Sequence, residues 1–294
     1  MKFVLLVLLA VAAVSLGVAG SSAATFPTCL GETATKMGTP GDDTITATDD
    51  DDVIVGLGGN DTIVGGGGFD LICGGDGNDS ILQTSGGFIG AAIISGDAGD
   101  DTVQAGRDTI VAADYEAAPA AVNVDLTAGK ATGDGTDTLV GIDFAYGSAF
   151  DDVLTGSAKQ NVLVGLDGND TISGLGGNDV IGAEAGNDSV DGGPGRDEMY
   201  YGESPKAVRV KLAKGTETGE GSDHLKSIEI VLGSKYADVL VGGSGPNTLN
   251  GGPGNDKLFG LAGRDTLIGA TGKDRADGGP GRDVCRAERV FHCP

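Results

Sequence analysis

Aspartate is the residue type whose spacing in this chain points most directly to chemistry. Of the 43 acidic residues, 34 are Asp and 9 are Glu. Many of the aspartates are the sixth residue of a glycine-rich block of nine residues, such as GLDGNDTIS at 165–173. Asp and Gly build turns and oxygen-rich loops, whereas Glu favours helices. A recurrent carboxylate in a glycine-rich turn supplies the oxygen ligands that a hard cation such as Ca²⁺ prefers.

These blocks also predict the elements that position the aspartates. They form three arrays, which start at Gly38, Gly147 and Gly233. The last three residues of each block have an apolar centre, such as Ile63 or Ile172, which predicts a short strand with that side chain turned inward. The six residues before the strand must reverse the chain, and glycine tolerates the positive φ that such turns need. Two blocks therefore make one flattened coil of 18 residues, and coils stack at about 4.8 Å.

Stacking places the aspartates of alternate blocks above one another, for example Asp170 with Asp188 and Asp179 with Asp197. Two carboxylates about 4.8 Å apart repel by about 0.9 kcal/mol in water, and by about 3–4 kcal/mol at an effective dielectric constant near 20. One inward apolar side chain per block is too thin a core to offset this repulsion. Ca²⁺ accepts six to eight oxygen ligands with flexible geometry and would remove it, whereas Mg²⁺ fits less well because it keeps its waters.

The motif Gly-Gly-x-Gly-x-Asp-x-apolar-x resembles the repeats-in-toxin (RTX), or hemolysin-type calcium-binding, nonapeptide repeat over nearly all of residues 38–286. The resemblance implies an all-β fold, a right-handed parallel β-roll with Ca²⁺ held between its turns. It assigns metal ligation to the sixth-position aspartates, which are Asp43, Asp61, Asp70, Asp79, Asp101, Asp170, Asp179, Asp188, Asp197, Asp256, Asp265, Asp274 and Asp283. It also assigns a part in metal binding to the fourth-position glycines, which are Gly59, Gly68, Gly77, Gly168, Gly177, Gly186, Gly195, Gly254, Gly263, Gly272 and Gly281.

The first blocks of the two later arrays depart from the motif. Phe150, Lys159 and Tyr236 replace the fourth glycine, and Asn161 and Asn247 replace the aspartate. We expect weak or absent metal binding in these blocks. With about three ions in each array, roughly nine Ca²⁺ would bind to the chain. The alternative role for any motif aspartate is an Asx-turn that only closes its own loop.

A longer repeat of 86 residues is superimposed on the short one, because residues 115–200 and 201–286 align without a gap. Each copy opens with a leader, 115–146 or 201–232, in which a Val-x-Val-x-Leu pattern predicts a short half-buried strand. We therefore expect five segments along the chain: a signal peptide (1–24), a first repeat array with an N-terminal cap (25–114), a second module (115–200), a third module (201–286) and a C-terminal cap (287–294).

The N-terminus predicts the compartment. Residues 1–24 combine a positive start, an apolar run and small residues, as secretory signal peptides do. A retained membrane anchor is the alternative. We expect an extracellular protein with no stable membrane insertion once the signal peptide is cleaved.

Four cysteines in an exported chain favour disulfides. Their positions suggest the pairs Cys29–Cys73 and Cys285–Cys293, one near each end of a solenoid whose ends need protection. A zinc site formed by Cys285, His292 and Cys293 is the alternative, but it lacks a fourth ligand.

Composition and motifs also exclude classes of function. A formal charge of −24 argues against nucleic-acid partners, which need a basic surface. The chain contains no His-Glu-x-x-His and no Gly-x-Ser-x-Gly motif, and its Lys and Arg residues do not cluster. We therefore expect a secreted, non-enzymatic protein that folds on Ca²⁺. Two alternatives remain: an adhesive module that binds a cell-surface or glycan partner through its leaders, and a secreted hydrolase with an unrecognised site.

Overall fold

The computed structural model describes residues 27–86 and 90–293. The expected signal peptide, residues 1–24, lies outside the described residues. The chain divides into two compact units, residues 1–146 and 147–294. This boundary falls between the leader and the repeats of the second module. The compact units therefore differ from the two copies of the 86-residue repeat, 115–200 and 201–286, and the division of the chain into modules remains a prediction.

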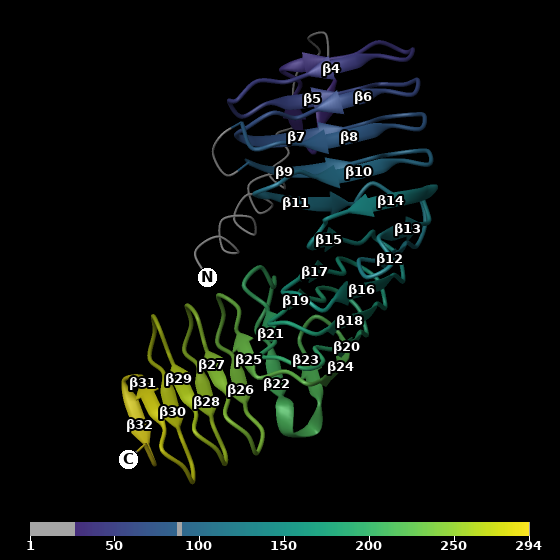
Figure 1. The fold of residues 1–294 in the computed structure, drawn as a ribbon. Coiled ribbons are helices and arrows are strands. Elements are labelled where there is room, and N and C mark those ends of the chain that lie inside the picture. The colour runs from purple at the N-terminus through teal and green to yellow at the C-terminus, as the bar shows by residue number, and fades with distance from the viewer. Residues whose placement is uncertain (1–26, 87–89, 294) are drawn as a thin grey trace. The chain divides into compact units, whose positions relative to one another are not determined.

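In the first unit, short strands stack as the rungs of two parallel sheets (Figure 1). One sheet contains β3 (Lys36–Met37), β5 (Val53–Val55), β7 (Phe69–Cys73), β9 (Gly90–Ser95), β11 (Thr109–Asp114) and β15 (Phe144–Tyr146). The other contains β4 (Thr44–Thr46), β6 (Thr62–Val64), β8 (Ser80–Gln83), β10 (Thr102–Ala105) and β14 (Thr136–Val140). Two antiparallel strands of the leader, β12 (Asn123–Asp125) and β13 (Lys130–Thr132), extend from β14, and a hairpin of β1 (Thr28–Cys29) and β2 (Glu32–Thr33) begins the described chain.

The second unit repeats this arrangement. One parallel sheet contains β17 (Val162–Val164), β19 (Val180–Gly182), β21 (Glu198–Tyr200), β25 (Ile230–Leu232), β27 (Thr248–Asn250), β29 (Thr266–Ile268) and β31 (Val284–Arg286). The opposite face begins with β16 (Val153–Ser157), β18 (Thr171–Leu175), β20 (Ser189–Asp191) and β24 (Ser222–Lys226). It continues with β22 (Arg209–Lys211), β26 (Val239–Val241), β28 (Lys257–Phe259), β30 (Arg275–Asp277) and β32 (Arg289–Phe291). The leader strand β23 (Thr216–Thr218) pairs antiparallel with both β22 and β24.

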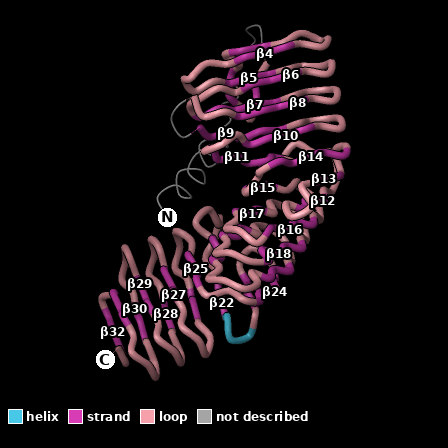
Figure 2. Tube along the Cα trace, in the orientation of Figure 1, coloured by secondary structure: helices cyan, strands magenta, loops and turns pink. Residues whose placement is uncertain are grey.

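The pairing register confirms the 18-residue coil. Ile63 pairs in parallel with Ile45 and with Ile81, which lie 18 residues before and after it. The central side chain of each strand points inward, so Ile63 and Leu258 are fully buried while their neighbours are not. Figure 2 shows the short strands joined by turns throughout the described chain. The fold is therefore the all-β parallel β-roll that the repeat predicts.

The leaders form strands where the Val-x-Val pattern predicts them. Val124 in β12 and Val210 in β22 are fully buried. A single turn of 3₁₀ helix, η1 (Leu212–Lys214), follows β22 and appears as the cyan segment in Figure 2. In the described part of the chain, no helix is long and apolar enough to cross a membrane.

Both predicted disulfides are present. Cys29 of β1 is bridged to Cys73 of β7, and Cys285 of β31 is bridged to Cys293. The second bridge uses both sulfur atoms of the zinc alternative. His292 lies instead with Nδ1 2.8 Å from an oxygen of Asp277.

Candidate metal centre

In the well-formed turns, the motif aspartate joins two stacked coils. The backbone N–H of Asp170 donates to Oδ1 of Asp188, 18 residues later, at 2.8 Å. The carboxylates thus connect coils rather than close their own loops. Twelve of the thirteen predicted aspartates accept this bond: Asp61, Asp70, Asp79, Asp101, Asp170, Asp179, Asp188, Asp197, Asp256, Asp265, Asp274 and Asp283.

The second oxygen of most of these carboxylates is buried and has no partner. Asp70 is the exception, because its Oδ2 accepts a hydrogen bond from Nε2 of Gln83 at 2.7 Å. A buried polar atom without a hydrogen bond costs about 1–3 kcal/mol, and more when it is charged. Among the predicted ligands, the unpartnered Oδ2 atoms belong to Asp61, Asp79, Asp101, Asp170, Asp179, Asp188, Asp197, Asp256, Asp265, Asp274 and Asp283.

Backbone oxygens face the same spaces. A Cβ atom at Gly174, the first residue of its block, would lie 2.3 Å from Oδ2 of Asp179 and 2.7 Å from the carbonyl oxygen of Gly192 in the next coil. At Gly186, a fourth-position glycine, a Cβ would lie 1.5 Å from the carbonyl oxygen of Gly168. The glycines therefore let carboxylate and carbonyl oxygens of successive coils approach one another, and no side chain fits between them.

The donor set suits a hard cation. No group of three or more His, Cys, Asp or Glu side chains that could hold a metal ion occurs in residues 27–86 and 90–293. The oxygens that meet in these turns are those of stacked carboxylates and of backbone carbonyls. That all-oxygen set is the kind that Ca²⁺ accepts, and it lacks the nitrogen and sulfur ligands that zinc prefers.

The electrostatics of the turns favour a bound positive charge. Burial, together with the neighbouring carboxylate of Asp197, raises the pKa of Asp179 to about 6. Burial together with neighbouring carboxylates raises the pKa of Asp188 to about 7 and that of Asp101 to about 8. The cross-coil N–H donor lowers each pKa but does not reverse the shift. Near neutral pH, the binding of a proton or of a cation to these carboxyls therefore stabilises the folded state.

The turn conformation that leaves Oδ2 unpartnered is strained. Position two has a positive φ even where the residue is not glycine: 82° at Leu57, 71° at Leu166, 65° at Leu175 and 72° at Leu261. Left-handed backbone costs a non-glycine residue about 1–2 kcal/mol. We had expected glycine to supply the positive φ, yet the turn holds leucine in the same conformation.

A different turn occurs in blocks where Ser or Thr stands at position two. The N–H and Oγ of Ser148 donate to the carboxylate of Asp152 at 2.5 and 2.8 Å. Ser157 bonds Asn161 in the same way. The same contacts join Thr39 to Asp43, Thr48 to Asp52 and Ser234 to Asp238. These acids close their own loops, so Asp43, one of the predicted ligands, differs from the other twelve.

Two further motif aspartates lie in the leaders, where the sequence reasoning missed them. Oδ1 of Asp137 accepts the backbone N–H of Asp101 at 3.0 Å, and Oδ1 of Asp223 accepts that of Asp188 at 3.1 Å. The signal was present in the sequence as Gly-x-Gly-x-Asp-x-Leu, at residues 133–139 and 219–225. The leader residues before these positions interrupt the nine-residue count, which hides the repeat.

The two leaders differ at this point. Tyr115 donates its hydroxyl hydrogen to Oδ2 of Asp137 at 2.8 Å. In the second leader, the hydroxyl of Tyr201, both carboxylate oxygens of Glu217 and Oδ2 of Asp223 are buried without hydrogen-bond partners. Burial and the neighbouring Asp223 raise the pKa of Glu217. The second leader therefore adds oxygens without hydrogen-bond partners next to Asp188. In the first leader, the hydroxyl of Tyr115 satisfies Oδ2 of Asp137 instead.

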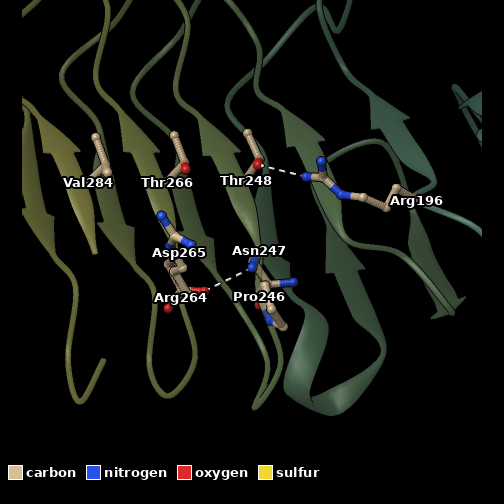
Figure 3. Close-up of a pocket in the computed structure, with 8 residues that line it drawn as sticks. All are labelled: Arg196, Pro246, Asn247, Thr248, Arg264, Asp265, Thr266 and Val284. Carbon is tan, nitrogen blue, oxygen red and sulfur yellow. Dashed lines mark hydrogen bonds between the residues drawn. The ribbon is translucent and has the colours of Figure 1, made fainter. Parts of the chain in front are cut away.

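Figure 3 shows the outer face over one pair of stacked turns. The carboxylate of Asp265 accepts the backbone N–H of Asn247 at 2.8 Å, and Arg196 donates to the hydroxyl of Thr248 at 3.2 Å. A shallow pocket of about 370 Å³ lies here, lined also by Arg264. These arginines are exposed and lie beside the turn rather than between its oxygens.

The comparisons with known proteins agree with this geometry. A family model described as the RTX calcium-binding nonapeptide repeat (4 copies) matches the chain in seven overlapping or separate segments, at residues 37–72, 59–82, 86–112, 146–181, 183–203, 232–267 and 259–288. The comparison with curated proteins finds no match. The segments that match the family model leave out most of both leaders, including the motif residues around Asp137 and Asp223. Together the matched segments cover more than half of the sequence, and the chain belongs to the family of RTX calcium-binding nonapeptide repeat proteins.

Proposed function

We propose that this is a secreted protein in which Ca²⁺, held between stacked turns, drives folding and maintains the folded state, and that its role is structural rather than catalytic. The observation that supports the proposal best is the row of buried Oδ2 atoms without partners, several of which lie close to a backbone carbonyl of the neighbouring coil, as at Asp79, Asp179 and Asp265. A bound Ca²⁺ would supply the positive charge that these oxygens lack.

The chain's own residues explain why folding would depend on the ion. Each coil buries a carboxylate whose charged form is destabilised by burial, as at Asp170 and Asp256. The sequence as a whole has a formal charge of −24 and 55 glycines, a composition that favours an expanded chain. When ligands come together only in the folded state, the free energy of metal binding becomes free energy of folding.

The stacked pairs suggest how many ions bind. In seven pairs that are joined by the cross-coil hydrogen bond, both members have an unpartnered Oδ2, and we propose one Ca²⁺ for each pair. The pairs are Asp61–Asp79, Asp79–Asp101, Asp170–Asp188, Asp188–Asp223, Asp179–Asp197, Asp256–Asp274 and Asp265–Asp283. This is fewer than the nine expected from three ions per array, because the degenerate turns satisfy their own acids.

Secretion is supported by the N-terminal sequence and the disulfides. RTX repeats and disulfides are both typical of secreted proteins. The affinities of extracellular calcium modules, about 10⁻⁴ to 10⁻³ M, would leave the chain unfolded in a calcium-poor cytosol and allow it to fold outside the cell. N-terminal sequencing of the protein from the culture medium should find a mature chain that begins at Thr25.

Limited proteolysis tests the calcium-driven folding. The mature protein should resist a non-specific protease in millimolar Ca²⁺ and be degraded in chelator, and equilibrium dialysis should find about seven ions per chain, one for each pair counted above. Equal resistance in chelator and in Ca²⁺ would contradict the proposal.

A further inference from the structure

Basic residues gather on one outward face of the second unit. In strands β22, β26, β28, β30 and β32, the first residue of each strand is outward-facing, and these residues pair in the order Arg209, Val239, Lys257, Arg275, Arg289. We call Arg209, Lys257, Arg275 and Arg289 the basic ladder. All four are exposed. The expectation that Lys and Arg do not cluster is wrong here, because residues far apart in the sequence are brought into line by the parallel register.

The charge along the sequence is strongly uneven. Residues 196–294 contain 14 Lys and Arg and 14 Asp and Glu, whereas residues 1–195 contain 5 and 29. Eight of the 14 acids in the C-terminal stretch are buried, while none of its basic residues is. The exposed surface of this stretch is therefore basic, although the protein as a whole is strongly acidic.

The ladder is not needed for the fold. Strands β4, β6, β8, β10 and β14 of the first unit have uncharged residues at the same position, which pair in the order Thr44, Thr62, Ser80, Thr102, Thr138. Like charges directly opposite one another on neighbouring strands destabilise a sheet. Within the described residues, no ion pair links an acid to Arg209, Lys257, Arg275 or Arg289. A row of uncompensated cations at a position that accepts threonine indicates a surface that meets a partner of opposite charge.

Aromatic rings lie on the same face. Phe259 and Phe291 occupy the last position of β28 and β32, where side chains also point outward, and Phe291 is 40 % exposed. The guanidinium of Arg275 lies 4.5 Å from the centre of the Phe291 ring. A cation–π contact of this kind holds the guanidinium in place. The face thus combines aligned cations with apolar ring surfaces, and the acid that lies between the two rings, Asp277 of β30, contacts His292.

We propose that the basic ladder binds an acidic polysaccharide, with the sulfate or carboxylate groups of one extended chain lying on Arg209, Lys257, Arg275 and Arg289. Strands about 4.8 Å apart repeat the cations at a spacing similar to that of anionic groups on successive sugar residues. Guanidinium groups bind such oxyanions through two parallel hydrogen bonds. The Phe rings offer flat apolar surfaces against which sugar rings pack.

The charge of the rest of the chain favours this class over other polyanions. Residues 1–195 carry a formal charge of −24. A nucleic-acid duplex or an anionic membrane presents many charges over a wide area and is repelled by that excess. One flexible polysaccharide chain can follow a single row of cations instead.

The test is binding of the calcium-loaded mature protein to immobilised dextran sulfate, with neutral dextran as the matched surface. The variant K257T/R275T/R289T places at each position the residue that the first unit uses there. The variant R196T/R264T/R282T removes the same charge from exposed turn arginines that lie outside the ladder. Circular dichroism in Ca²⁺ checks that both variants are folded.

We expect the wild type to bind dextran sulfate and not dextran, the ladder variant to bind about tenfold more weakly or worse, and the turn variant to bind as the wild type does. Each cation that contacts the polyanion should add about 0.7–0.9 to the slope of log affinity against log salt. The slope for the wild type should therefore be about −3, and this prediction can be tested without any variant. Equal losses in the two variants, absence of binding, or a slope near zero would overturn the proposal. Tighter binding to single-stranded DNA or to phosphatidylglycerol vesicles through the same residues would overturn the assignment to polysaccharide.

Discussion

Oδ1 of Asp179 accepts the backbone N–H of Asn161 at 2.8 Å, while its Oδ2 is buried without a partner. The two oxygens of one carboxylate thus differ: one joins successive coils of the solenoid, and the other is the atom that we propose binds a cation. Asn161 itself, in the preceding coil, is satisfied within its own loop by Ser157. This difference between neighbouring coils lets the structural and metal-binding roles of the motif be tested separately.

Replacing Asp179 by Asn should have opposite effects with and without calcium. The amide keeps the acceptor for the N–H of Asn161 and removes a buried charge, so in chelator the fraction of folded chain should rise. The loss of one charged ligand should weaken Ca²⁺ binding at that site about tenfold, or about 1.4 kcal/mol. Far-UV circular dichroism in chelator measures the first effect, and a Ca²⁺ titration of the same signal measures the second.

Asp152→Asn is the matched control, because the carboxylate of Asp152 is already satisfied by Ser148. It should leave the calcium midpoint unchanged. A control that shifts the calcium midpoint as much as Asp179→Asn does would show that the two kinds of turn are not distinct.

Without calcium, the protein should be more stable at acidic pH than at alkaline pH. Burial raises the pKa of Asp79 to about 6, of Asp170 to about 7 and of Asp101 to about 8, from an ordinary value of 3.8. The folded state therefore binds more protons than the unfolded state between these values. The stability that these protons contribute is complete below about pH 3.8 and is lost as the pH rises through 6 to 8.

Far-UV circular dichroism of calcium-free protein, recorded as a function of pH, measures this dependence. The β signal in chelator should grow as the pH falls from 8 to 5, and millimolar Ca²⁺ should reduce the difference by replacing the protons. A β signal in chelator that shrinks as the pH falls over this range would be evidence against buried carboxylates without partners.

The tyrosines at equivalent positions of the two leaders should respond differently to loss of the hydroxyl. Tyr115→Phe leaves Oδ2 of Asp137 buried without its donor, and should lower the free energy of unfolding by about 1–3 kcal/mol. Tyr201→Phe removes a hydroxyl that has no partner, and should be neutral or stabilising. Urea unfolding of both variants provides the comparison. Equal losses would mean that the two leaders are not distinguished by this hydrogen bond.

Leu175 offers a test of strain in the turn. Its φ is 65° and its side chain is 40 % exposed, so substitution there changes backbone preference more than packing. A β-branched residue tolerates positive φ least. Leu175→Val should therefore lower the free energy of unfolding by about 1 kcal/mol, whereas Leu175→Gly should not lower it. If valine is tolerated as well as glycine, the turn does not hold a left-handed residue in solution.

The spacing of glycine and aspartate predicted most of the fold, because each repeat uses the same local rule. Ile63 was expected to point inward and to stack on residues 18 positions away, and it does. The hidden repeats around Asp137 and Asp223 were missed because the leaders interrupt the nine-residue count. The leader strands before those repeats interrupt the nine-residue period of the sequence. The strands of successive coils still pair in parallel, as β10 with β14 and β20 with β24.

Other features could not be predicted because they depend on contacts between coils. Nothing in the sequence of a single block shows that Gln83 satisfies Asp70, since the two side chains belong to different blocks and meet only in the folded solenoid. The basic ladder is hidden for the same reason. Lys257 and Arg275 are 18 residues apart in sequence and become direct neighbours only through the register of β28 and β30.

Far-UV circular dichroism of residues 25–294, titrated with Ca²⁺ after removal of metal, tests the central claim most directly. The account predicts a cooperative change from a coil spectrum to a β spectrum, with a much weaker response to Mg²⁺ because that ion keeps its waters. A spectrum that is already rich in β structure in chelator and does not change with Ca²⁺ would contradict it. The aspartates would then serve only to join the coils.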